Sequence, residues 1–180
     1  MDPQLYNLRR KVEHYQEVLQ TTLNNRQVWQ DELRETIVEK LKALTKEVGL
    51  EASVDVRKDL ENLEGVVLSL GDVKSGLSQR LNDTLKRDLI KHNGSLIYQQ
   101  LFNRKVIVLI NYPHIENYGE PREPKTLSIY RPEELQAPFF IRHLDAFIQE
   151  ITNWEDFDDE EPMKRIGFNM GINPNEPAAE

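Results

Sequence analysis

The 180-residue chain contains no cysteine. This absence excludes disulfide bonds and every metal site built on thiolates. Because cytosolic proteins rarely need disulfides, we expect a cytoplasmic protein. Long apolar runs are also missing, since the longest, Val106 to Ile110, is far shorter than the roughly 20 residues that a membrane-spanning helix needs. No apolar signal-peptide segment follows the N-terminus, and we expect no membrane insertion.

Catalytic and cofactor motifs are absent as well. The chain has no GxSxG, no GxGxxG and no P-loop, and the lysine-containing segment 71–76 lacks the GK[ST] ending that binds phosphate. No pair of histidines has the helical HExxH spacing of a zinc site. We therefore predict no cofactor and no metal, and favour a non-enzymatic role.

A basic surface is the third missing feature. The net charge is −8, and residues 153–180 carry two basic and eight acidic side chains, which gives −6 for the tail alone. Residues 1–49 carry eight of each sign and are neutral overall. Without a basic stripe, nucleic-acid binding is not expected.

A long helix is predicted for residues 3–48. Asp2 can cap its first turn, Pro3 suits the first helical position, and Gly49 is placed to end it. Apolar residues recur at alternating steps of three and four, as in a heptad repeat. The positions of this pattern are Leu5, Leu8, Val12, Tyr15, Leu19, Thr22, Arg26, Trp29 and Leu33, followed after a four-residue step by Ile37, Leu41, Leu44 and Val48.

The length and pattern of this helix predict self-association. A heptad pattern that is kept for four repeats and then shifted by four residues is typical of a coiled coil with a stutter. A helix of about 46 residues is about 70 Å long, more than one small domain can cover. We therefore predict a homodimer formed through this helix. The alternative is a single amphipathic helix whose C-terminal half packs on the domain, because polar Thr22 and Arg26 weaken the middle of the pattern.

The remaining elements are predicted from their periodicity. Alternating residues at 52–58 and the apolar run at 64–70 indicate strands. Four leucines spaced four apart indicate a helix that ends at Asn93-Gly94. Two strand-like runs flank Asn103-Arg104, which is typical of a β-hairpin, and the segment 125–130 forms another strand. The leucines of the predicted helix are Leu77, Leu81, Leu85 and Leu89.

A final helix begins near Pro138, with Phe140, Leu144, Phe147 and Ile151 on one face. The predicted order is therefore α-β-β-α-β-β-β-α. This order indicates an α+β fold with a mostly antiparallel five-stranded sheet behind a long, coiled-coil-like N-terminal helix. We divide the chain into the helix 1–49, an α+β domain 50–152 and an acidic, largely flexible tail 153–180.

The segment Asn111–Pro124 connects two predicted strands and is longer than most hairpin connections. Its three prolines favour a stiff connector. The same loop carries Tyr112, His114, Tyr118 and Arg122, and loops on a rigid sheet are frequent binding sites. We predict that these four residues contact a protein partner. The alternative is a small-molecule or enzymatic site, in which His114 and Glu116 act as acid and base and Arg122 binds an anion.

The other histidines have simpler interpretations. His14 lies among charged residues off the apolar pattern of the long helix and is expected in solvent. His92 would end the predicted helix at Asn93-Gly94, where the helix dipole favours a cation. His143 is expected to pack beside the apolar face of the last helix or to lie on the surface.

The tail interleaves Trp154 and Phe157 with six acidic residues up to Glu161. Such a segment is suited to dock in a basic, apolar groove of a partner. The alternating apolar residues of 166–172 could instead add a strand to a sheet edge. In a third interpretation, Trp154 completes the apolar face of the last helix and the rest is a solubilising tail. Together these features indicate a protein–protein interaction or assembly module, with a partner that the sequence does not identify.

Overall fold

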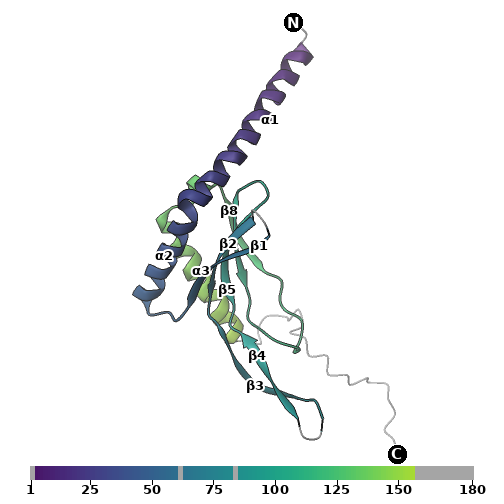
Figure 1. Ribbon diagram of the computed structural model, residues 1–180, viewed down its shortest axis with the longest axis vertical. Helices are drawn as coiled ribbons and strands as arrows, with labels where there is room; N and C mark the ends of the chain where they lie inside the picture. Colours follow the sequence, from purple (N-terminus) through teal and green to yellow (C-terminus); the bar gives the residue numbers. More distant parts are fainter. Residues whose placement is uncertain (1–2, 61–62, 83–84, 157–180) are drawn as a thin grey trace, which may run out of the picture.

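The structure is a computed structural model, and it describes residues 3–60, 63–82 and 85–156. It begins with one continuous helix in three parts, α1 (Pro3–Val28), a π-helical segment η1 (Trp29–Leu33) and α2 (Arg34–Val48). Gly49 follows in the left-handed conformation, with φ of 71°, and ends the helix as predicted. Most of α1 projects away from the rest of the molecule, whereas α2 lies against the sheet (Figure 1).

The buried residues of this helix recur every four positions from Asn25 to Thr45. In a regular α-helix each four-residue step advances 400°, so a stripe with this spacing rotates by about 40° per step. A π-helical turn is wider, because its hydrogen bonds join residues five apart, and it takes back part of this rotation. The π segment lies where the predicted heptad pattern shifts. It therefore keeps one face of the helix on the sheet. The buried residues are Asn25, Trp29, Leu33, Ile37, Leu41 and Thr45.

A five-stranded, fully antiparallel sheet carries the fold, in the order β1-β2-β5-β6-β8. This confirms the predicted α+β class and antiparallel sheet, and a strand lies at each of the five places where one was expected. The loop of the β5–β6 hairpin includes Arg104, with φ of 63°. The strands are β1 (Ser53–Leu60), β2 (Leu63–Ser69), β5 (Ser95–Gln100), β6 (Val106–Asn111) and β8 (Lys125–Tyr130).

The helix predicted between the second and third strands is wrong. The segment forms a hairpin of β3 (Asp72–Arg80) and β4 (Lys86–His92), and the short strand β7 (His114–Ile115) joins it to complete a second sheet of three strands. The hairpin extends from the end of the molecule opposite α1 (Figure 1).

Local chemistry explains this difference. A helix over this segment would have to contain Gly76, which here has φ of 79°, together with several serine and asparagine residues of low helix propensity. The Asn82 side chain instead accepts a hydrogen bond from the Leu85 N–H at 2.7 Å, which supports a turn. Of the four leucines that defined the predicted helix face, only Leu89 is buried. Their four-residue spacing therefore does not reflect packing in the hydrophobic core.

The hydrophobic core lies between the sheet and two helices, α2 and α3 (Ala137–Glu155). A short 3-10 turn, Pro132–Glu134, leads into α3. The apolar face of α3 is buried as predicted, through Phe140, Leu144, Phe147 and Ile151. The strands contribute Val54, Val66, Leu68, Leu96, Tyr98, Val106, Val108 and Ile110 to the same cluster. We call this assembly of α2, α3 and the strands the body.

Candidate interaction surfaces

Both ends of the loop 111–124 are tied to helix α3. Tyr112 is buried, and its hydroxyl donates a hydrogen bond of 2.6 Å to Glu150 Oε2. The guanidinium of Arg122 lies 4.1 Å above the centre of the Tyr112 ring, a cation–π contact. Lys125, just after the loop, donates to Glu150 Oε1 at 2.5 Å. Two predicted contact residues, Tyr112 and Arg122, therefore contact each other and fix the loop.

The protonation states of this cluster follow from its geometry. Burial, together with the adjacent Glu150 carboxylate, raises the pKa of Tyr112 to about 12. Burial also acts to raise the pKa of Glu150, but hydrogen bonds from Lys125 and Tyr112 outweigh it and lower the pKa below its usual value. At neutral pH Glu150 is therefore a carboxylate and Tyr112 a neutral phenol.

His114 meets His92, a residue that the sequence did not connect to it. The two imidazoles are stacked, with ring centroids 4.5 Å apart. His92 Nδ1 lies 2.6 Å from Asp72 Oδ1, and its Nε2 lies 3.5 Å from Glu116 Oε1. The prediction that His92 ends a helix is wrong, because it lies on β4 and pairs with β7. The histidines join the hairpin to the loop.

Acidic residues flank this histidine pair, yet among the described residues no group of three or more histidine, aspartate or glutamate side chains is placed to hold a metal ion.

The fourth predicted loop residue, Tyr118, is half-buried, and its backbone N–H donates to the Ile115 carbonyl at 3.1 Å. Its neighbours in the loop, residues 119–124, are exposed.

Trp154 belongs to the last turn of α3 and is half-buried. The ammonium of Lys91 lies 5.2 Å from the centre of its ring and also pairs with Glu155 at 2.5 Å. Trp154 therefore contacts the hairpin strand β4. Phe157, the other predicted contact residue of the tail, lies outside the described residues.

A buried polar chain under α3 centres on His143, which is 5% exposed. Its Nδ1 lies 3.0 Å from the Tyr98 hydroxyl and its Nε2 lies 3.0 Å from the Tyr130 hydroxyl. Burial, with a smaller effect of Arg142, lowers the pKa of His143 to about 4. The imidazole is therefore neutral at pH 7 and donates to one tyrosine while accepting from the other.

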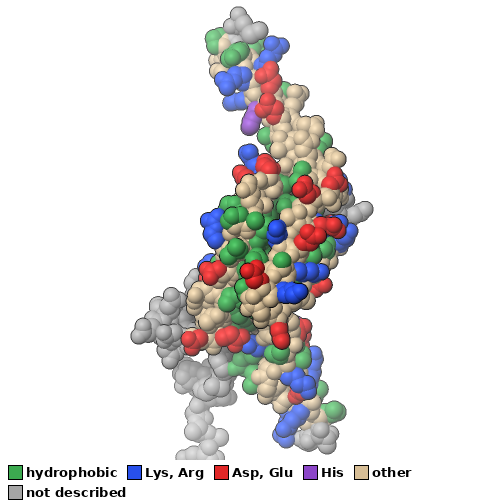
Figure 2. Space-filling model, turned by 90° about the vertical axis from the view of Figure 1, so that its left-hand side faces the viewer, with side chains coloured by type: hydrophobic (Ala, Val, Ile, Leu, Met, Phe, Trp, Pro, Cys, Tyr) green, Lys and Arg blue, Asp and Glu red, His purple; other side chains and the backbone are tan. Residues whose placement is uncertain are grey.

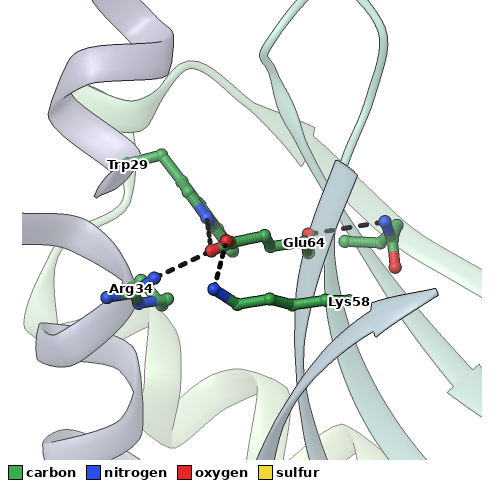
Figure 3. Close-up of polar contacts among 5 residues, drawn as sticks. Trp29, Arg34, Lys58 and Glu64 are labelled. Carbon is green, nitrogen blue, oxygen red and sulfur yellow. Dashed lines mark hydrogen bonds and ion pairs between the residues drawn. The ribbon is translucent and has the colours of Figure 1, made fainter. Parts of the chain in front are cut away.

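A second buried polar cluster attaches the π segment to the sheet (Figure 3). Glu64 on β2 accepts hydrogen bonds from Trp29 Nε1 at 3.3 Å and from Arg34 Nη1 at 2.9 Å. Lys58 Nζ lies 2.9 Å from the other carboxylate oxygen. Burial opposes ionisation of Glu64, but hydrogen bonds from Lys58, Arg34 and Trp29 lower its pKa overall.

This cluster was not predicted from the sequence. A carboxylate at the start of a buried apolar strand was the available signal, because buried acids are almost always paired with cations or hydrogen-bond donors. Its partners could not be named, since Trp29 and Arg34 are 35 and 30 positions away.

An exposed apolar strip runs along α1 and is formed by Leu5, Leu8, Val12, Tyr15 and Leu19. Between 47% and 61% of the surface of each residue is exposed. No residue from Pro3 to Asn24 is buried. Hydrophobic side chains lie among charged ones on this projecting part of the helix (Figure 2).

The C-terminal end of this apolar strip lies next to the body. The next positions of the heptad pattern, Thr22 and Arg26, are half-buried. Trp29 and Leu33 follow them and are buried, at 0% and 6% exposure. The body therefore covers the continuation of the strip on the same helix.

Neither α3 nor the long helix is apolar enough to cross a membrane, within the part of the chain that the structure describes. No family model, curated protein or solved structure matches this chain.

Proposed function

We propose that this protein is a non-enzymatic assembly module that self-associates as a dimer through the apolar strip of α1. The observation that carries this proposal is the strip itself, five large apolar side chains in heptad spacing that the body leaves open. Large exposed apolar patches on proteins commonly mark interaction sites. The spacing fits another helix, because heptad positions interlock as knobs into holes.

Energetics favour a partner for this helix. Most helical stability in proteins comes from packing of an apolar face, and the apolar strip of α1 lies open in a single chain. Burial of one leucine-sized side chain contributes roughly 1.5–3 kcal/mol. A dimer would bury the remaining exposed surface of ten apolar side chains, five from each chain, and this gain opposes the cost of association.

The loop and tail supply the outer contacts in this proposal. The exposed part of the loop, beside Tyr118, and the half-exposed His114 are presented on a fixed scaffold, because Tyr112 and Arg122 hold the loop on α3. Trp154 and the acidic tail that follows it would contact the same class of partner, a protein with a basic and apolar groove.

Sedimentation equilibrium tests the self-association. We expect a mass twice the 21.1 kDa of one chain. The double substitution Leu8→Glu with Leu19→Glu places charges at two layers of the strip in each chain. Because each buried leucine contributes roughly 1.5–3 kcal/mol, the dissociation constant should rise more than about a hundredfold.

The matched control is Tyr6→Glu with Thr21→Glu. Tyr6 is exposed to a similar degree as Leu8, at 52% against 56%, but lies off the heptad positions. The control should remain dimeric. A wild-type chain that stays monomeric at all concentrations, or equal weakening by both variants, would refute the proposal.

A further inference from the structure

We propose that the apolar strip pairs with the same strip of a second copy that runs in the opposite direction. This inference rests on the proposed self-association. It adds the orientation of the two chains, and therefore the shape of the assembly.

The first observation is that the body closes the strip at one end. Trp29 and Leu33 continue the heptad pattern, and both are buried in the body of their own chain. Thr22 and Arg26 are already half-buried. A second helix can therefore lie on the strip only as far as about Thr22, where it meets the body.

This closure disfavours a parallel pair. In a parallel pair the two strips face each other at equal levels, so Trp29 of one chain lies level with Trp29 of the other. Each chain has its own sheet on that side of the helix. The two bodies would then have to occupy the same space, next to the C-terminal end of the paired helices. In an antiparallel pair each body lies beyond the free end of the other helix, and the competition disappears.

The second observation is the sizes of the residues along the strip. In a parallel pair, identical residues share a layer, so Tyr15 faces Tyr15 and Thr22 faces Thr22. In an antiparallel pair, Tyr15 faces Val12, Leu5 faces Thr22 and Leu8 faces Leu19. Tyr15 and Leu5 then each face a smaller residue, which fills the space between two helices more evenly.

The third observation is the length of the free helix. The 17 steps from Leu5 to Thr22 span about 26 Å at 1.5 Å per residue. In the antiparallel register all of this length is paired, and Pro3 of one chain lies level with Asn24 of the other. Asn25 is the first buried residue of the helix. The paired segment therefore ends where the body begins, at both ends of the dimer.

The absence of cysteine makes disulfide cross-linking a clean test. A disulfide requires Cα atoms within about 7 Å of each other. We expect that a mixture of Leu8→Cys and Leu19→Cys chains, equilibrated and then oxidised, forms a mixed disulfide between positions 8 and 19. Each variant alone should form at least tenfold less, because identical positions are about 16 Å apart along an antiparallel pair. An affinity tag on one variant identifies the mixed product.

Tyr6→Cys and Thr21→Cys form the control pair, since they have the same levels in this register but lie off the strip. Their mixture should not cross-link. Strong cross-linking of Leu8→Cys alone would show a parallel pair, overturning this inference and leaving the proposed self-association in place. A dimer by sedimentation that forms none of these disulfides would also overturn it. A monomer by sedimentation would refute the proposed function itself.

Discussion

His143 shows how a single buried side chain makes the stability of this fold depend on pH. It is neutral between two tyrosine hydroxyls, and burial raises the pKa of Tyr98, so the Tyr98 hydroxyl stays protonated at neutral pH. The chain holds an ordinary histidine in its unfolded state, with a pKa near 6.5. As pH falls, the unfolded state therefore binds a proton before the folded state does.

We predict that the free energy of unfolding falls by about 3 kcal/mol between pH 6.5 and pH 4 through His143 alone. The lowered pKa of about 4 sets this size, at about 1.4 kcal/mol for each step of one in pKa. The contribution is complete above pH 6.5 and is lost as pH falls. Urea unfolding gives the free energy of unfolding of the wild type and of His143→Gln across this range. The difference between the two proteins should change with pH by this amount.

The control for this measurement is His14→Gln, on the exposed surface of α1. That variant should keep the full pH dependence of the wild type. The same pH dependence in His143→Gln and wild type would show that the buried imidazole does not titrate as proposed.

The contacts of a residue such as His143 do not follow from sequence periodicity. The apolar face of α3 follows from helical periodicity, so Phe140 and Phe147 were placed correctly. His143 could be placed only near that face, because its partners lie 45 and 13 positions away on separate strands. Periodicity describes neighbours along the chain, whereas these contacts depend on how strands are ordered across the sheet.

At the scale of elements, Glu64 joins the π-helical segment to strand β2. Its carboxylate meets Trp29 and Arg34 from the helix and Lys58 from β1, so three elements converge on one side chain (Figure 3). The side chain of Glu64 is 11% exposed and that of Arg34 is 25% exposed, but that of Lys58 is 63% exposed. The contacts of Glu64 with Trp29 and Arg34 should therefore contribute more to the stability of the fold than its contact with Lys58.

We predict that Glu64→Gln destabilises the fold by about 1–3 kcal/mol, because it removes the charge while leaving the buried donors in place. Lys58→Met should cost less than about 1 kcal/mol, as expected for an exposed ion pair. The pKa of Glu64 is lowered in the folded state, so its contribution is present above pH 4.5 and is lost as pH falls further.

Urea unfolding of both variants at pH 7 and near pH 3 measures these effects. The difference in the free energy of unfolding between wild type and Glu64→Gln should be smaller at the lower pH. Equal losses for the two variants at pH 7 would contradict the account of this cluster.

The elements also show why one prediction failed. Strands with clear alternation, such as 52–58, were found because period two is unambiguous. The segment 72–92 has leucines four apart, but three of the four point to solvent on a projecting hairpin. Four-residue spacing indicates a helix only where the rest of the protein buries one face of that helix. The sequence does not reveal that this segment lies outside the core.

The whole molecule has a compact body with α1 projecting at one end and the β3–β4 hairpin at the other (Figure 1). The length and heptad spacing of α1 were visible in the sequence. The point at which the body covers the heptad pattern was not, because it depends on the packing of Trp29 and Leu33 against the sheet. That point limits where a second helix can bind and underlies the orientation proposed for the dimer.

Small-angle X-ray scattering of the full chain tests the central claim most directly, because one curve reports both mass and shape. We predict twice the mass of one chain and two maxima in the distribution of interatomic distances, from two bodies separated by about 30 Å of paired helix. The Leu8→Glu with Leu19→Glu variant should give one maximum and the mass of one chain. A wild-type curve with the mass of one chain at every concentration would contradict the account.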